Sequence, residues 1–173
     1  PLRPEQLKVA IIGAGATGVE LAAELHRTTR EMVAYGLDRV DADKDIRVSV
    51  IEAAPRVLPA LPERLSQATE SLLAKLGVEV HTHAKVAEVL PGGVRLADGR
   101  LLPAELVVWA AGVKAPDFLK NIAGLETNRT NQLVVKPTLQ TSRDDDVFAI
   151  GDCAACAWPQ VDHGKGGMVP PLP

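Results

Sequence analysis

Six residues near the start of the chain constrain its fold more than any other feature of the 173-residue sequence. Residues 13–18 read Gly-Ala-Gly-Ala-Thr-Gly and fit the pattern G-x-G-x-x-G. They follow an apolar run, residues 8–12, of the kind typical of a buried parallel strand. Apolar residues then recur at helical spacing over residues 16–35. A glycine-rich turn between a strand and a helix predicts a dinucleotide-binding unit, because the first N–H groups of the helix face the pyrophosphate.

The three glycines of this motif have different expected roles. We expect Gly13 to permit the tight turn, Gly15 to let the backbone approach a pyrophosphate, and Gly18 to let the helix pack closely on the strand. Ala16 and Thr17 open the helix and complete the expected phosphate-binding set. A glycine turn without a ligand is the alternative, and the flanking strand and helix favour the ligand-binding interpretation.

An acidic residue, Glu52, ends the next strand-like segment, residues 46–52. In this position a carboxylate accepts hydrogen bonds from the adenosine ribose and repels a 2′-phosphate, so the pattern favours NADH over NADPH. Glu52 and the adjacent Ala53 are therefore candidate cofactor-binding residues. Glu52 lies farther from Gly18 than the usual spacing of about 20 residues, and a long helix followed by the polar residues 37–45 accounts for the excess. A solvated glutamate at a strand end is the alternative.

Periodicity and turn residues extend this start into an α/β fold. We expect a helix at residues 63–76 and further parallel strands at 78–83 and 105–109, because strand–helix–strand order implies right-handed parallel crossovers. Short strand-like segments separated by glycine turns predict a small antiparallel β-meander at residues 86–90, 94–96 and 100–102. The predicted fold class is α/β, a Rossmann-like parallel sheet with a small antiparallel β-meander.

Residues 1–112 account for one complete unit, and residues 113–173 have a different composition. The second segment carries several prolines and short strand-like pieces at 133–135 and 147–150. It does not read as a second whole domain, and its Gly- and Pro-rich end, residues 164–173, lacks periodicity.

Composition argues against several function classes. The formal net charge is −3 and the basic residues are not clustered, which argues against a nucleic-acid surface. No apolar run approaches the roughly 18 residues of a membrane span and the chain opens without a secretory leader, so we expect a cytoplasmic protein. Cys153 and Cys156 lack a second pair or a suitably spaced histidine, so we expect no metal site. A redox role for the two cysteines is the less favoured alternative.

Three segments, residues 9–25, 108–112 and 138–154, closely resemble the type II NADH dehydrogenases, the single-subunit NADH:quinone oxidoreductases. The resemblance implies a flavoprotein in which an NADH domain is inserted within an FAD domain. It also implies that hydride passes from NADH to FAD and that electrons then pass to quinone. Residues 1–112 would be the NADH-binding domain, and residues 113–173 an incomplete strip of the FAD-binding domain.

The resemblance also suggests site residues. Glu20 matches an acid that faces the nicotinamide and flavin, which makes it the candidate catalytic residue, although a carboxylate early in a helix also stabilises the helix dipole. Gly151 and Asp152 match the late flavin motif, whose aspartate contacts the ribityl-pyrophosphate part of FAD. A backbone turn that lies against the bound nucleotide in the family corresponds to Ala110, Ala111 and Gly112.

The chain also departs from the family pattern. It has a single G-x-G-x-x-G motif, whereas the family opens with its own FAD motif, and residues 172–173 do not continue the family's sequence. We therefore expect an internal piece of the enzyme, inactive alone. Membrane contact would come only through C-terminal helices absent here, with the intact enzyme peripheral on the cytoplasmic face of the inner membrane.

Two other functions stay open. A reductase of the same architecture would pass electrons to a ferredoxin-like or disulfide partner instead of quinone, and an acceptor screen would separate the two. A non-catalytic module would bind NAD without flavin chemistry.

Overall fold

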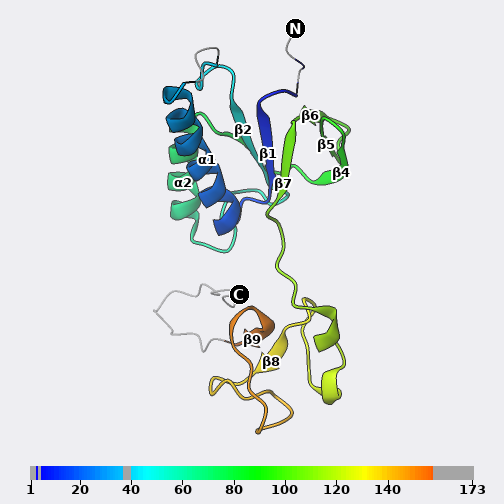
Figure 1. The fold of residues 1–173 in the computed structure, drawn as a ribbon. Coiled ribbons are helices and arrows are strands. Elements are labelled where there is room, and N and C mark those ends of the chain that lie inside the picture. Colours follow the sequence, from blue (N-terminus) through cyan, green and yellow to red (C-terminus); the bar gives the residue numbers. More distant parts are fainter. Residues whose placement is uncertain (1–2, 4, 37–39, 158–173) are drawn as a thin grey trace. The chain divides into compact units, whose positions relative to one another are not determined.

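The chain divides into two units, Pro1–Ala111 and Gly112–Pro173. The computed structural model describes residues 3, 5–36 and 40–157 (Figure 1). The proline-rich end at residues 164–173, including the departure from the family pattern at 172–173, lies outside the described residues.

The first unit is built on a parallel sheet with strand order β3-β2-β1-β7. All three strand pairs are parallel, and Ile12 at the end of β1 faces both Ile51 of β2 and Trp109 of β7. The central position of β1 follows from its continuous apolar sequence, because a strand covered on both faces needs apolar residues throughout. The elements of this layer are β1 (Lys8–Ile12), α1 (Ala16–Ala34), β2 (Arg47–Ile51), α2 (Glu63–Lys75), β3 (Glu79–His81) and β7 (Leu106–Trp109).

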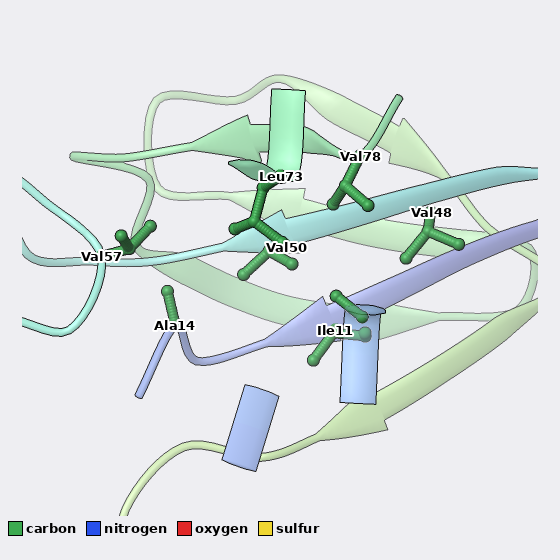
Figure 2. Close-up of a cluster of buried hydrophobic side chains, with 8 residues drawn as sticks. Ile11, Ala14, Val48, Val50, Val57, Leu73 and Val78 are labelled. Atoms are coloured by element: carbon green, nitrogen blue, oxygen red, sulfur yellow. The ribbon is translucent and has the colours of Figure 1, made fainter. Parts of the chain in front are cut away.

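Two different layers cover the two faces of this sheet (Figure 1). On one face Ile11 and Val50 pack with Leu73 of α2 in a cluster that also contains residues of α1 (Figure 2). On the other face the neighbouring residue Ile12 packs with Leu96. Successive side chains of a strand point to opposite faces, so β1 supplies both clusters.

An antiparallel meander provides the second layer. It consists of β4 (Val86–Leu90), β5 (Gly93–Leu96) and β6 (Leu101–Pro103), in that spatial order. The predicted α/β fold class, with a parallel sheet and a small antiparallel meander, is confirmed.

The second unit has a smaller core around Leu119, Leu133 and Ala149. Its elements are the 3-10 helices η1 (Asp117–Leu119), η2 (Ile122–Gly124) and η3 (Gly151–Cys153) and the parallel strand pair β8 (Leu133–Val135) and β9 (Ala154–Cys156).

The strand predicted at residues 147–150 is wrong. Within this segment the structure has only an isolated bridge between Gln140 and Phe148, and the second strand of the pair is β9 instead. Phe148 and Ile150 are 60 % and 67 % exposed, so their apolar pattern does not correspond to burial in a sheet. Apolar spacing alone cannot distinguish a strand paired in a sheet from an exposed segment with the same apolar residues.

Candidate functional site

The candidate site lies where three parallel strands of the first unit end. The glycine-rich loop follows β1, Glu52 follows β2 and Ala110 follows β7, and these strands are direct neighbours. The Ala110 N–H donates to the Ile12 carbonyl at 2.8 Å. In open α/β sheets ligands bind outside the carboxyl ends of the strands, which is the edge these residues share.

Neighbouring backbone lies so close to Gly13 and Gly18 that neither position has room for a side chain. Gly13 has φ +106°, and a Cβ at this position would lie 2.8 Å from backbone and side-chain atoms of Ala111. A Cβ at Gly18 would overlap the carbonyl oxygen of Gly13. These contacts are consistent with the expected turn at Gly13 and the expected close helix packing at Gly18.

Gly15 differs from both. It has φ −70° and ψ −176°, a conformation open to any residue, and no atom of the described residues lies within 4 Å of a Cβ built on it. Gly15 is the N-cap of α1, no side chain caps this end, and the first turn carries no acid. The exposed residues Ala16 and Thr17 supply the first helical N–H groups, which have no acceptor within the helix and are free to donate to an anion such as phosphate.

The Glu52 carboxylate is fixed against the glycine-rich loop. Its Oε2 accepts the Ala14 N–H at 2.8 Å and its Oε1 accepts the Ala54 N–H at 2.8 Å. An ionised carboxylate offers about four acceptor positions, so each oxygen keeps capacity for a ribose hydroxyl. Ala53, between the two, is exposed. The two loop bonds were not expected from the sequence, because a strand-end glutamate carries no signal for them.

Ala14 holds the loop through both of its backbone groups. Its N–H donates to Glu52, its carbonyl accepts the Leu58 N–H at 2.8 Å, and its side chain is fully buried (Figure 2). Leu58 adopts φ +47°, in the left-handed region that non-glycine residues rarely occupy. Neither residue was expected to contribute to the site, and the position of Ala14 between two glycines is the one sequence signal that marks it.

Two of the expected site residues lie apart from these contacts. Glu20 is exposed in the second turn of α1, and its place beside the nicotinamide stays a prediction. Gly112, with φ +78°, begins the second unit and is exposed.

The second unit contains the expected flavin-motif residues Gly151 and Asp152. Gly151 has φ +68°, and both residues are exposed in η3. The Asp152 carbonyl accepts a 3.1 Å hydrogen bond from Nε2 of Gln132, which is 9 % exposed. The Oε1 of Gln132 in turn accepts from Asn128 Nδ2 at 2.9 Å and Thr130 Oγ1 at 3.0 Å. This network fixes the backbone of η3 and leaves the Asp152 carboxylate on the surface.

A charged group near this network has a perturbed pKa. Lys114 donates to Oδ1 of Asp117 at 2.7 Å, and the same oxygen accepts from the buried Asn131 at 2.7 Å. The hydrogen bond from Lys114, followed by that from Asn131, lowers the pKa of Asp117 below its usual value.

Cys153 and Cys156 are both free thiols. The Cys153 thiol donates to the Ile150 carbonyl at 3.0 Å. Among residues 3, 5–36 and 40–157, no group of three or more His, Cys, Asp and Glu side chains is placed to hold a metal ion. In the same residues, no helix is both long and apolar enough to cross a membrane.

Comparison with known proteins agrees with the resemblance drawn from the sequence. The chain is 45 % identical to the type II NADH:quinone oxidoreductase of Haemophilus influenzae over 166 residues, which cover 96 % of this chain and 36 % of that protein. The chain thus spans about one third of the length of the curated relatives that it matches.

Solved structures share the fold. A ferredoxin reductase from Rhodopseudomonas palustris superposes with a TM-score of 0.67 and 30 % identity, over 86 % of this chain and 34 % of that one. NDH2 from Plasmodium falciparum in complex with NADH superposes with a TM-score of 0.71 and 23 % identity, over 87 % of this chain and 32 % of that one.

The family model for pyridine nucleotide-disulphide oxidoreductases matches residues 1–167, nearly the whole sequence. This match agrees with the parallel sheet and with the glycine-rich loop at its carboxyl edge. The chain therefore belongs to the pyridine nucleotide-disulphide oxidoreductase family.

Proposed function

We propose that this chain is the NADH-binding portion of a flavin-dependent NADH:quinone oxidoreductase, joined to part of its FAD-binding domain. The observation that carries the proposal is the meeting of the glycine-rich loop and Glu52 at one sheet edge, with the Glu52 carboxylate bonded to the loop. The similarity to a type II NADH:quinone oxidoreductase over 96 % of the chain supports quinone as the acceptor.

The residues at this edge divide the work of binding a dinucleotide. The open space at Gly15 and the uncapped N-terminus of α1 receive the pyrophosphate. Glu52 accepts the ribose hydroxyls, and Ala110 and Ala111 form the backbone wall beside the loop.

The remaining site residues orient the reacting groups. Glu20 lies toward the nicotinamide, and Gly151 and Asp152 bind the ribityl-pyrophosphate part of FAD in the whole protein. When bound, FAD supplies the acceptor for the hydride of NADH. The whole protein is expected on the cytoplasmic face of the inner membrane as a peripheral enzyme, with quinone as its second substrate.

The preference for NADH over NADPH tests the proposed role of Glu52 in nucleotide binding. With NADPH the ribose hydrogen bonds to Glu52 are lost and the 2′-phosphate meets a like charge. Calorimetric titration of this chain should therefore give an affinity for NADH about 30- to 1000-fold above that for NADPH, or roughly 2–4 kcal/mol. Equal affinities would contradict the assignment of Glu52.

Two variants sharpen this titration. Glu52→Gln should shrink the preference for NADH, because the repulsion between the carboxylate and the 2′-phosphate is removed. Glu63→Gln removes the same charge from an exposed position at the start of α2 and should leave the preference unchanged.

A ferredoxin-type acceptor is the second candidate, favoured by the superposition on a ferredoxin reductase. Stopped-flow mixing of the NADH-reduced whole protein with a quinone or with a ferredoxin separates the two. We expect rapid reoxidation by quinone only, and reoxidation by ferredoxin alone would establish the second candidate.

A further inference from the structure

The loop between β2 and α2 contains an arginine, Arg56, that has no contact with the nucleotide in the function proposed above. The guanidinium of Arg56 donates to the carbonyl of Pro59 at 2.9 Å and to that of Leu61 at 2.8 Å. It also donates to the hydroxyl of Ser66 in α2 at 3.0 Å, and Ser66 is 1 % exposed. One side chain thus joins two points of the loop to the adjoining helix.

The segment held by Arg56 is the one that contacts the glycine-rich loop. Leu58 donates its N–H to the Ala14 carbonyl, and its own carbonyl accepts the Leu61 N–H at 2.9 Å. Leu58 has φ +47°, a conformation that persists in a non-glycine residue only where surrounding contacts fix it. Arg56 donates to the carbonyls of Pro59 and Leu61, which follow Leu58 in the chain, so its guanidinium stabilises the turn that contains Leu58.

We infer that Arg56 is a positioning residue for dinucleotide binding, which acts through Leu58 and Ala14 on the glycine-rich loop. This inference rests on the proposed function of that loop. The planar fork of an arginine donates to several acceptors at fixed angles, whereas the ammonium group of a lysine cannot reproduce that geometry. Arg56 is therefore engaged with the loop carbonyls and Ser66, and its effect on the nucleotide is indirect.

Hydrogen exchange measured by NMR on this chain tests the inference without a ligand. Arg56→Ala should accelerate exchange of the Leu58 and Ala14 amides about tenfold or more, while amides of β1 and β2 exchange as in the wild type. Arg56→Lys should stay close to the alanine variant. Arg64→Ala, an exposed arginine in α2, is the matched control and should change neither amide.

Calorimetric titration of the same variants supplies the second measurement. Arg56→Ala should weaken NADH binding about tenfold, and Arg64→Ala should not. If Arg56→Ala does not fold, Ser66→Ala removes one acceptor and should give a smaller change at the same amides.

Three outcomes would overturn the inference. They are unchanged exchange at Leu58 and Ala14, full recovery with Arg56→Lys, and a uniform rise across the sheet that marks general destabilisation. If wild-type chain does not bind NADH, the proposed function fails, whereas the exchange rates still decide whether Arg56 holds the loop.

Discussion

Two glycine-containing turns, one in each unit, are supported in different ways. The loop at residues 13–18 follows a strand with a partner on each side, and Gly13, Ala14 and Gly18 all make close contacts. The turn at Gly151–Cys153 precedes β9, which pairs with β8, and among the described residues its side-chain hydrogen bonds are those from Gln132 to the Asp152 carbonyl and from Cys153 to the Ile150 carbonyl. The loop in the first unit is therefore shaped by the sheet itself, and the turn in the second unit by a few polar contacts.

The strongest test of this contrast places a methyl group in the tight part of the first loop. Gly18→Ala should lower the free energy of unfolding by about 2–3 kcal/mol, because its Cβ would meet the backbone of Gly13. Urea denaturation followed by circular dichroism measures the change. Gly15→Ala is the control within the same motif, with an expected loss of at most about 1 kcal/mol from the weaker N-cap.

The variants Gly18→Ala and Gly15→Ala also separate an effect on folding from an effect on NADH binding. Gly15→Ala should weaken NADH binding although the chain stays folded, since its Cβ enters the open space at the helix N-terminus. A Gly18→Ala chain as stable as the wild type would show that the helix can move away from the loop without cost.

A weaker effect is expected in the second unit. Gln132→Ala leaves the Asp152 carbonyl, Asn128 and Thr130 without their shared partner, so it should cost about 1–2 kcal/mol. Scanning calorimetry of the whole chain measures this loss. Gln140→Ala removes the same kind of bond, Nε2 to a backbone carbonyl at 3.0 Å, from a half-buried residue whose bond is open to solvent, and should cost less than about 0.5 kcal/mol. Equal losses would show that the Gln132 network does not specifically support η3.

The smallest expected effect concerns acid titration. The lowered pKa of Asp117 means that its carboxylate favours the folded state at neutral pH, and that this contribution is lost as the pH falls through the lowered pKa. Lys114→Met removes the largest cause, so the pKa of Asp117 should move up toward its usual value of about 3.9. An NMR titration of the carboxyl group measures the shift, and an unchanged pKa would assign the effect to Asn131.

The sequence predicted the first unit well because its elements carry strong local signals. The apolar runs of β1 and β2 and the helical spacing of α1 located these elements to within one or two residues. The glycine motif also indicated the loop that the structure places at the carboxyl edge. The signals were local, so a single sequence was enough.

Contacts between loops were beyond such reasoning. The bonds that join Ala14 to Glu52 and Leu58 depend on the tertiary arrangement, and no periodic pattern marks them. The strand β9 was missed for a related reason. Its Ala-Ala-Cys sequence has little strand propensity, and it is paired because β8 lies beside it.

The place of β7 beside β1 has a kinetic consequence. Gly13 lies against Ala111, the last residue of the first unit, so the wall of the glycine-rich loop comes from the opposite end of that unit's chain. Such a non-local pairing must overcome the entropy of closing a long loop before it forms. During synthesis, β1 therefore keeps one unpaired edge until β7 has emerged, and the nucleotide edge is completed late in the folding of the unit.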